Sequence, residues 1–418
     1  MEIVHGLQVL QSKQLMTDRI LIGISGGIAA YKVCEIVSAL AKAGKQVRVI
    51  LTESAAKFVA PLTFATLSRY AAYTDFDFWQ PNHGRPLHIE LGEWADIFLL
   101  APVTANTLSK LAAGAADNLL TNTVLASQCP ILLAPAMNTT MWQQNSVQQN
   151  WQRLQMDRRY FSIEPTSGIL ACDVIGTGRM AEPEVILDYV ESLLWTKGKR
   201  DLVGKHVLVS AGGTREWLDP VRFIGNPATG KQGIALATAA AHRGANVTLI
   251  QSMPLNQSLN QQQLIAQIIP VSTSAEMHME MLKFFPQADI TIMAAAVGDV
   301  RPTIRFDRKI PKAELPSSLV LENIPDILAD LSQQKRPNQI LVGFAAQTGS
   351  ESEIMELAKE KLRRKNLDAI AANVVGSAET GFGSATNQAT LIDRKGKQTT
   401  TPLCSKLELA HRLLDFLG

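Results

Sequence analysis

The chain has 418 residues, of which 46% are hydrophobic, and a formal net charge of +2 at pH 7. At roughly 100–200 residues per domain this length predicts two domains, each with enough apolar residues to bury a core. The near-neutral charge, with no Lys/Arg tract, argues against a nucleic acid or an acidic membrane surface as partner. Four scattered cysteines without a CxxC pair exclude a zinc ribbon and favour a reducing, cytoplasmic setting over a disulfide framework.

The first fifteen residues carry neither a basic segment nor a sustained apolar run. We therefore expect neither a signal peptide nor a membrane anchor there, and the folded part to begin near Met16. No other apolar run reaches the roughly 20 residues that a membrane-spanning helix needs. These observations predict a soluble protein without a membrane partner.

Short apolar runs alternate with longer helical patterns through the first half of the chain. A glycine turn follows the first strand, and a helical stretch then runs to Ala43. The last helix of this half is Pro183–Trp195, with its proline near the N-terminus, where it is tolerated. The alternation predicts a parallel sheet with helices on both faces. The predicted strands are Arg19–Ser25, Gln46–Thr52, Asp96–Leu100 and Pro130–Ala134.

Residues 196–204 are polar and charged, contain two glycines and are predicted to be a linker. The same alternation then restarts, with a helix over about Lys231–Arg243 and a hairpin over Ala389–Thr400. We predict an α/β protein of two doubly wound parallel-sheet domains in tandem, flavodoxin- or Rossmann-like, over 17–195 and 205–418. The strands of the second half are Lys205–Ala211, Asn246–Gln251, Asp289–Ala296, Gln339–Ala345 and Asp368–Ala372.

Both halves open with a strand, a glycine turn and a helix. The turns are Gly26-Gly27-Ile28 and Gly212-Gly213-Thr214. Glycine lets the backbone approach an anion, and a helix N-terminus supplies unpaired N–H groups. Either turn alone could serve only tight packing of strand on helix. Together they predict one phosphate-bearing ligand in each half, at the carboxyl ends of the strands.

A longer motif makes the first half specific. Residues 135–142 (PAMNTTMW) resemble the PxMNxxMW motif of the flavin-dependent cysteine decarboxylases. Residues 101–108 (APVTANTL) are similar to that family's flavin loop, and 88–91 (HIEL) to its histidine segment. Ala171-Cys172 and residues 176–180 (GTGRM) resemble its substrate flap. The four segments occur in the family's order.

This resemblance implies FMN as cofactor. The flavin oxidises the thiol carbon of an N-acyl cysteine to a thioaldehyde, which takes up the electrons released with CO2, and then reduces the enethiol. His88 would be the base, Asn138 would hold the substrate carboxylate, and Cys172 would return a proton. Asp173 stands where the family commonly has glycine. The implied FMN-binding residues are Gly26, Gly27, Ile28, Thr52, Thr104, Ala105, Asn106, Thr107 and Ala136.

The second half carries its own resemblance. Residues 212–224 (GGTREWLDPVRFI) are similar to the GGTREPLDPVRFI signature of phosphopantothenate–cysteine ligases. Residues 226–231 take the place of that family's NxSSGK segment, with Pro227 as a departure. Later blocks at 294–299, 325–327, 343–346 and 361–366 follow in order. The family's KxKK run appears as residues 309–312, with Pro311 in its third position.

The second resemblance implies that CTP activates a carboxylate, with Mg2+ and lysines offsetting the charge of the triphosphate. Asn226 and Lys309 would be catalytic, and Arg222 and Asn226 would bind the substrate. No metal ligand is predicted. The implied nucleotide-binding residues are Gly212, Gly213, Thr214, Met293, Ala294, Ala295, Asp299, Lys309, Pro325, Asp326, Ile327, Leu328, Phe344, Lys361 and Lys365.

Together the two resemblances imply a bifunctional enzyme of coenzyme A biosynthesis. It would ligate 4'-phosphopantothenate with L-cysteine and decarboxylate the product to 4'-phosphopantetheine. Trimeric decarboxylase contacts and dimeric ligase contacts would build a homo-oligomer, up to a dodecamer. One alternative is a flavin-binding, non-catalytic regulatory protein, but the chain lacks the acidic tail usual in those. Another is an NAD-dependent redox enzyme, but the second-half strand ends at Gln251, without a carboxylate for a ribose.

Overall fold

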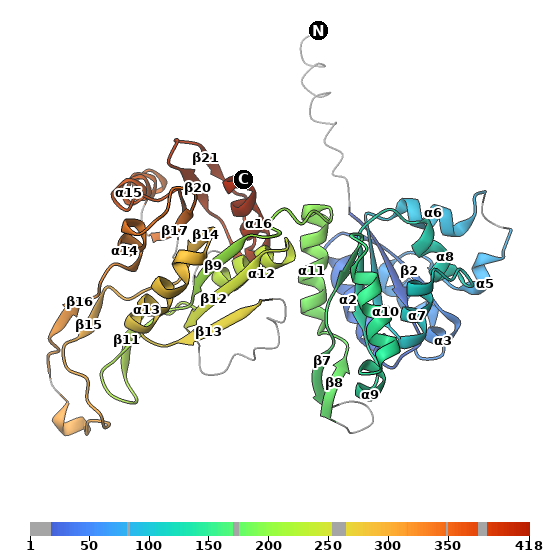
Figure 1. Cartoon of the computed structure of the whole chain (residues 1–418), viewed down its shortest axis with the longest axis horizontal. Coiled ribbons are helices and arrows are strands. Elements are labelled where there is room, and N and C mark those ends of the chain that lie inside the picture. The colour runs from blue at the N-terminus through green and yellow to red at the C-terminus, as the bar shows by residue number, and fades with distance from the viewer. Residues whose placement is uncertain are drawn as a thin grey trace, which may run out of the picture. The chain divides into compact units, whose positions relative to one another are not determined.

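The computed structural model describes residues 18–81, 84–169, 175–252, 265–315, 317–347, 350–374 and 383–418. The chain folds into two compact units that divide between Gly198 and Lys199, inside the predicted linker (Figure 1). Each is described by itself below as unit 1 and unit 2. Among the described residues, no helix has the length and apolar composition to cross a membrane.

Unit 1 is built on a six-stranded sheet in which every neighbouring pair is parallel. The predicted parallel sheet is therefore confirmed. β1 and β4 are buried along almost their whole length, as expected for central strands covered on both faces. In spatial order the strands are β3 (Ala72–Tyr73), β2 (Gln46–Leu51), β1 (Arg19–Ile24), β4 (Ile97–Val103), β5 (Ile131–Pro135) and β6 (Tyr160–Ser162).

The strand order reverses between β1 and β4, which creates a crevice at the carboxyl ends of these strands. An antiparallel hairpin, β7 (Thr166–Ile169) with β8 (Ile175–Arg179), lies outside the main sheet and against α9 (Figure 1). The helices of unit 1 are α2 (Ala30–Lys42), α3 (Glu53–Ala56), α4 (Pro61–Ser68), α5 (Asp75–Phe78), α6 (Leu87–Trp94), α7 (Ala105–Ala113), α8 (Leu119–Ala126), α9 (Thr139–Trp142), α10 (Asn145–Gln155) and α11 (Pro183–Thr196).

Unit 2 contains an eight-stranded sheet. Six strands are parallel, and the last two form the predicted hairpin. The first strand of this hairpin is antiparallel to its neighbours on both sides, so the edge strand runs in the same direction as the six. In spatial order they are β13 (Gln267–Val271), β12 (Asn246–Ser252), β9 (His206–Ala211), β14 (Ile290–Met293), β17 (Ile340–Gln347), β18 (Ala369–Val374), β20 (Thr390–Asp393) and β21 (Gln398–Thr400).

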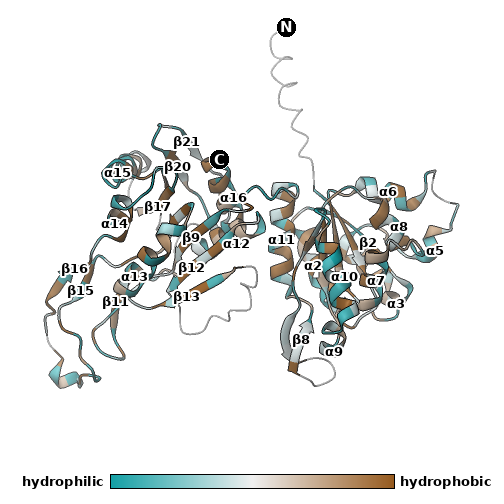
Figure 2. Ribbon diagram, in the orientation of Figure 1, coloured by the Kyte–Doolittle hydropathy of each residue, from teal (hydrophilic) through white to brown (hydrophobic). Residues whose placement is uncertain are grey.

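The helices of unit 2 are α12 (Lys231–His242), α13 (Ser274–Phe284), α14 (Ile327–Gln333), α15 (Glu351–Arg364) and α16 (Lys406–Leu417). In Figure 2 the outer helix α15 is largely hydrophilic, whereas α11 of unit 1 is largely hydrophobic. Single turns of 3-10 helix occur at η2 (Phe285–Gln287) and η3 (Lys312–Glu314), and β19 (Thr386–Asn387) pairs with β22 (Cys404–Ser405).

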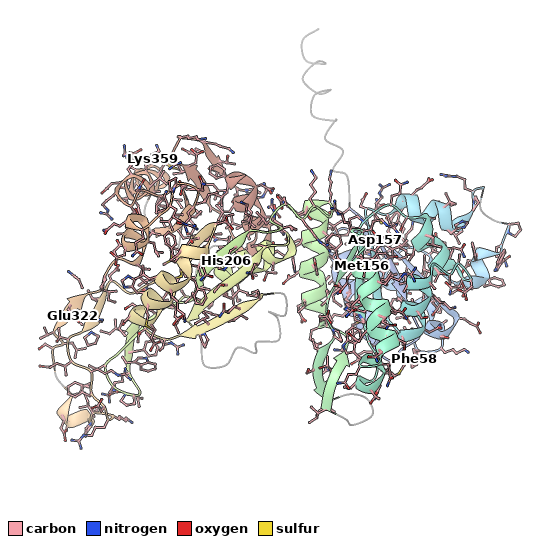
Figure 3. The ribbon with its side chains drawn as sticks, viewed as in Figure 1. Phe58, Met156, Asp157, His206, Glu322 and Lys359 are labelled. Atoms are coloured by element: carbon pink, nitrogen blue, oxygen red, sulfur yellow. The ribbon has the colours of Figure 1, made fainter. Side chains whose placement is uncertain are left out.

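Two short strand pairs of unit 2 lie outside its sheet. β10 (Arg215–Trp217) pairs with β11 (Phe223–Gly225), and β15 (Val300–Pro302) pairs with β16 (Leu321–Asn323). The latter pair and the chain between its strands extend away from the sheet and are called the arm below (Figure 1). Glu322, labelled in Figure 3, accepts a hydrogen bond of 2.6 Å from Arg301 across the arm.

The predicted linker is not a free spacer. Thr196 ends α11, and residues 201 and 202 are bonded to unit 2. The Arg243 side chain, 6% exposed, pairs with Asp201 of this segment and with Asp415 of α16. The backbone N–H of Leu202 also donates to the carbonyl of Arg243. A buried guanidinium therefore fastens the start of unit 2 to its last helix.

Candidate functional sites

A cavity of about 1070 Å³ lies at the carboxyl ends of the unit 1 strands. Each turn that follows a central strand contributes to it: Gly26–Ile28 after β1, Thr52 after β2, Thr104–Thr107 after β4 and Ala136 after β5. These turns contain all nine residues predicted to bind the flavin. The structure therefore brings that whole set into one cavity.

The glycine turn after β1 packs closely against the segment that follows β2. A Cβ on Gly26 would lie 2.3 Å from the Cβ of Ser54, so a larger residue has no space there. The buried Ser25 hydroxyl donates to the carbonyl of Pro102 at 2.6 Å and accepts from the N–H of Thr104 at 2.9 Å. This hydroxyl holds the turns after β1 and β4 together at the crevice.

Helix α7 points its N-terminus at the cavity. Thr104 is its N-cap and accepts from the N–H of Thr107, and the helix ends at Gly114 in the left-handed conformation. Thr104 through Thr107 line the cavity. The positive end of the helix dipole thus lies where an anionic or electron-rich group would be stabilised.

Asn138 lines the same cavity from the N-cap position of α9. Its Oδ1 accepts from the N–H of Thr140 at 2.8 Å, which fixes the orientation of the amide. The N–H of Met137 donates to the carbonyl of Gly178, so this loop is joined to β8. Residues 170–174, which include the predicted acid Cys172 and Asp173, lie outside the described residues.

An ion-pair network that the sequence motifs did not indicate lies at the cavity. Glu182 accepts from Lys32 of α2 at 2.8 Å and from Arg179 of β8 at 3.2 Å. Lys32 and Arg179 both line the cavity. Two cations share one carboxylate here, which leaves an excess positive charge beside the ligand space.

His88 does not line this cavity. It lies on α6, and its ring contacts that of Phe78 edge to face, with centroids 5.4 Å apart. Its Nδ1 is buried and has no hydrogen-bond partner among the described residues. Within one copy of the chain, the predicted base is therefore not among the residues that line the cavity with Asn138.

Unit 2 has a cavity of about 630 Å³ at the carboxyl ends of its parallel strands. Asn226 lines it, as do twelve of the fifteen residues predicted to bind the nucleotide. These are Gly212, Met293, Ala294, Ala295, Asp299, Pro325, Asp326, Ile327, Leu328, Phe344, Lys361 and Lys365.

Lys361, in the last turn of α15, and Lys365, the C-cap residue of that helix, differ in their surroundings. Lys361 is half-buried, and this burial together with the neighbouring charge of Lys365 lowers its pKa to about 8. Its Nζ donates to the carbonyl of Phe344 at 2.8 Å. Lys365 pairs with Asp326 at 2.7 Å. Desolvation would raise the pKa of Asp326, but the hydrogen bond and charge of Lys365 outweigh it and lower that pKa.

Gly213 and Thr214 lie behind the cavity wall instead of lining it. A Cβ on Gly213 would be 2.5 Å from the carbonyl oxygen of Asn226, so glycine here lets the Asn226 loop pack closely. The hydroxyl of Thr214 accepts from the N–H of Gly298 at 2.9 Å. Both residues therefore shape the site from outside.

Arg222 and Lys309 are also not among the lining residues. Arg222 donates to the carbonyl of Ile310, the residue after Lys309. Sequence reasoning missed further lining residues. Lys231 stood inside a quoted motif and could have been found. Several other polar residues of the lining carry no local signal, among them Gln232, Asn373, Asn387 and Lys406. Among the described residues, no cluster of His, Cys, Asp and Glu could hold a metal ion.

Comparisons with known proteins follow the division into units. Residues 9–194 match the family described as Flavoprotein, and residues 202–418 match the DNA/pantothenate metabolism flavoprotein C-terminal domain. The chain is 45% identical over 401 residues to the coenzyme A biosynthesis bifunctional protein CoaBC of Bacillus subtilis, covering 96% of this chain and 97% of that protein.

The CoaBC protein of Vibrio cholerae is 40% identical over 410 residues, covering 97% of this chain and 99% of that protein. Among solved structures, a PPC decarboxylase mutant complexed with pantothenoylaminoethenethiol is 35% identical. It covers 43% of this chain and 98% of that chain, with a TM-score of 0.39.

Proposed function

The chain belongs to the coenzyme A biosynthesis bifunctional protein family, and from this premise we propose how its two cavities divide the chemistry. It is a bifunctional enzyme with phosphopantothenate–cysteine ligase and flavin-dependent phosphopantothenoylcysteine decarboxylase activities. Unit 1 carries the flavoprotein match and unit 2 the ligase match. What remains to be proposed is which residues act, and on which ligands.

FMN binds in the unit 1 cavity. The observation that carries this proposal is that nine residues from four separate turns line one space of about 1070 Å³. The Gly26 turn, where a Cβ would collide with Ser54, and the N-terminus of α7 fit a phosphate and a flavin ring. When bound, FMN supplies the oxidation and later reduction at the thiol carbon of the substrate.

The protein groups then have separate tasks. Asn138, held by its bond to the Thr140 N–H, donates from its amide to the substrate carboxylate and orients it for CO2 loss. His88 takes the proton during oxidation, because imidazole titrates near neutral pH. Cys172 returns a proton to the enethiol carbon.

His88 lies away from the cavity of its own copy, so the decarboxylase site is shared between copies. Four large apolar side chains of α3, α4, α5 and the adjoining turns are exposed: Phe58 (51%), Leu62 (75%), Phe76 (73%) and Trp79 (79%). Phe58 is labelled in Figure 3. Such a surface fits a trimer contact that brings α6 of one copy to the flavin of another.

The ligase site takes CTP and Mg2+ in the unit 2 cavity. Lys361 of α15 and Lys365, the C-cap residue of that helix, line the cavity together with Asp299. Like charges four residues apart repel, which an anionic triphosphate relieves. Mg2+ arrives with the nucleotide, because its phosphate oxygens supply most of the ligands that this ion needs. The substrate carboxylate attacks the α-phosphate of CTP and displaces pyrophosphate. Asn226 stabilises the resulting acyl cytidylate, and the amine of cysteine then attacks its carbonyl carbon and displaces CMP.

The arm gives a surface for the ligase dimer. Apolar side chains are exposed on it and on the neighbouring β10–β11 pair. They are Val221 (57%), Phe223 (46%), Ile304 (64%) and Val320 (73%). Dimeric ligase contacts and trimeric decarboxylase contacts in the same chain combine into a dodecamer.

The deciding experiment incubates the purified protein with 4'-phosphopantothenate, cysteine and Mg2+ and either CTP or ATP, and identifies the products by mass spectrometry. We expect 4'-phosphopantetheine with CTP and a yellow protein absorbing near 450 nm. A colourless protein purified gently, or no amide with either nucleotide, would contradict the proposal.

The shared decarboxylase site has its own test. A His88→Asn chain and an Asn138→Asp chain should each be inactive alone as decarboxylases. Mixed during refolding, they should recover activity, because some sites then combine an intact His88 with an intact Asn138. Recovery should vanish when both substitutions are placed in one chain and mixed with itself. No recovery in the mixed sample would show that each copy completes its own site.

A further inference from the structure

A carboxylate of unit 2 is buried completely although no substrate role has been assigned to it. Asp219 is 0% exposed and lies in the turn between β10 and β11. Its Oδ1 accepts from the backbone N–H groups of Val221 and Arg222, each at 2.8 Å. These two bonds are local and close the turn.

The second oxygen of Asp219 reaches a segment that is distant in sequence. Its Oδ2 lies 3.4 Å from the backbone nitrogen of Ile310, which donates to it, and 3.3 Å from Nη1 of Arg222. Nη2 of Arg222 in turn donates to the carbonyl of Ile310 at 3.2 Å. Asp219 and Arg222 thus hold both backbone groups of one residue, and that residue directly follows Lys309.

Further bonds and burial make this a fixed connection. The N–H of Phe306 donates to the carbonyl of Leu218 at 2.8 Å, so the same turn binds the segment at a second point. Ile310 is 6% exposed, whereas Lys309 beside it is exposed. The buried residue Ile310 therefore anchors the segment, and its neighbour Lys309 is exposed to solvent.

The charge of Asp219 is needed for this arrangement. Desolvation would raise the pKa of its carboxyl, but three backbone N–H groups and the charge of Arg222 outweigh that effect and lower it. Leaving Arg222 without its anion would uncouple it from Ile310, because a half-buried guanidinium gains more from water than from one carbonyl.

We propose that Asp219 is a positioning residue of the ligase. It holds the segment that carries Lys309 against the β10–β11 turn, and so limits the positions from which Lys309 and Arg222, neither of which lines the cavity in this structure, reach the nucleotide-activated substrate. This inference rests on the roles that the ligase resemblance implies for Lys309 and Arg222. Asp219 itself touches neither nucleotide nor substrate. Its contribution is to remove the conformational freedom of a loop that carries a catalytic cation.

The test uses the full-length protein with Asp219→Asn, and Asp307→Asn as matched control, because Asp307 is an exposed carboxylate on the same segment. Pyrophosphate release from CTP with phosphopantothenate should fall about tenfold or more in Asp219→Asn, as expected for loss of a charged hydrogen-bond network. It should stay at the wild-type rate in Asp307→Asn. Decarboxylation of added phosphopantothenoylcysteine should be equal in all, because that site lies in unit 1.

A second readout reports position independently of activity. Trypsin should cut the Lys309–Ile310 bond about tenfold faster in Asp219→Asn than in the control, since the anchor of Ile310 is weakened. Should Asp219→Asn fail to fold, Ile310→Pro removes the N–H that donates to Asp219, with Ile310→Val as its control for the changed side chain. Because trypsin does not cut a Lys–Pro bond, cutting is followed after Arg308 in both variants. Faster cutting there and slower pyrophosphate release should appear in the proline variant alone.

A third variant separates this inference from its premise. The Lys309→Gln variant should release pyrophosphate slowly, whereas trypsin should cut it after Arg308 at the wild-type rate. Wild-type ligation in Lys309→Gln would remove the proposed role of Lys309. A slow Lys309→Gln beside a wild-type Asp219→Asn would keep that role and overturn the positioning by Asp219.

Discussion

Gly26 has no room for a side chain at the flavin cavity. A Cβ there would meet Ser54 at 2.3 Å, whereas one on Gly27 would meet its nearest neighbour, the Thr104 side chain, at an ordinary 3.5 Å. The two adjacent glycines therefore offer a matched pair. Substituting each of them tests whether the turn after β1 requires glycine because of packing within the protein or only because a ligand lies close to it.

Gly26→Ala should cost about 1–3 kcal/mol of stability through overpacking and should lower the flavin content of the purified protein. Gly27→Ala should leave the thermal unfolding temperature close to that of the wild type. Differential scanning calorimetry and the absorbance near 450 nm measure the two effects. Equal unfolding temperatures for both variants would show that Ser54 moves aside without cost.

Lys361 predicts a pH dependence of nucleotide binding. Because burial lowers its pKa to about 8, the side chain loses its charge as the pH rises through that value. CTP should therefore bind more weakly above about pH 8, measured by titration calorimetry between pH 7 and 9.5. Lys361→Arg should remove this dependence, since a guanidinium stays charged throughout. A wild-type affinity that is flat to pH 9.5 would exclude Lys361 from the triphosphate site.

At the residue scale, the sequence motifs located residues that line the two cavities, but not the contacts that these residues make with distant parts of the chain. The turns after strands place short-range motifs at one sheet edge, so the flavin set and most of the nucleotide set could be listed in advance. Glu182 and Lys406 could not, because their positions depend on how distant helices pack. His88 and Arg222 had the expected residue type, but their surroundings depend on tertiary structure.

Helices α12 and α16 of unit 2 enclose two histidines. Burial lowers the pKa of His242 to about 3, with a smaller effect from His411, and burial next to Arg243 lowers that of His411 to about 4. Both folded values lie below the roughly 6.5 of an unfolded chain. The unfolded state therefore binds more protons between these limits, and stability that is complete above about pH 6.5 is lost as the pH falls.

By pH 5 each histidine should lower the free energy of unfolding of unit 2 by about 2 kcal/mol relative to pH 7.5. Urea titrations at the two pH values measure the difference. The pKa of Asp201 is also lowered, but this carboxyl takes up protons only below the range from pH 7.5 to 5. The change in stability over that range therefore comes mainly from the two histidines. His411→Gln should remove about half of the difference, and an unchanged wild-type stability at pH 5 would refute the assignment.

Elements differ in how well the sequence predicts them. The strands β1, β2, β9 and β12 were found within one residue at each end, because β-rich runs of six or seven residues are hard to mistake. β4 continues three residues past its predicted end at Leu100. The β7–β8 hairpin and the arm were not predicted as strands. β16 is exposed at every residue and β8 is rich in glycine, so neither has the alternation that marks a half-buried strand.

At the scale of the whole molecule, we predict that two fragments of unit 2 differ in stability according to the residue at which they begin. A fragment that starts at Lys199 keeps Asp201 beside Arg243, whereas one that starts at Lys205 leaves the buried guanidinium with Asp415 alone. We expect the shorter fragment to unfold at lower temperature, by a free energy of about 1–3 kcal/mol. Both should bind CTP, because the cavity lies within residues 212–406. Equal stabilities would show that the segment before Lys205 only connects the units.

The last helix also sets the order in which the protein can mature during synthesis. Unit 1 holds every strand of its sheet and its closing helix α11 before Gly198, so it can fold while the rest is still being translated. Unit 2 cannot, because α16, the final element, covers α12 and supplies the second partner of Arg243. A chain released before α16 has been made would thus combine a finished flavin-binding half with an open, alanine-rich surface, a state that chaperones and proteases can recognise.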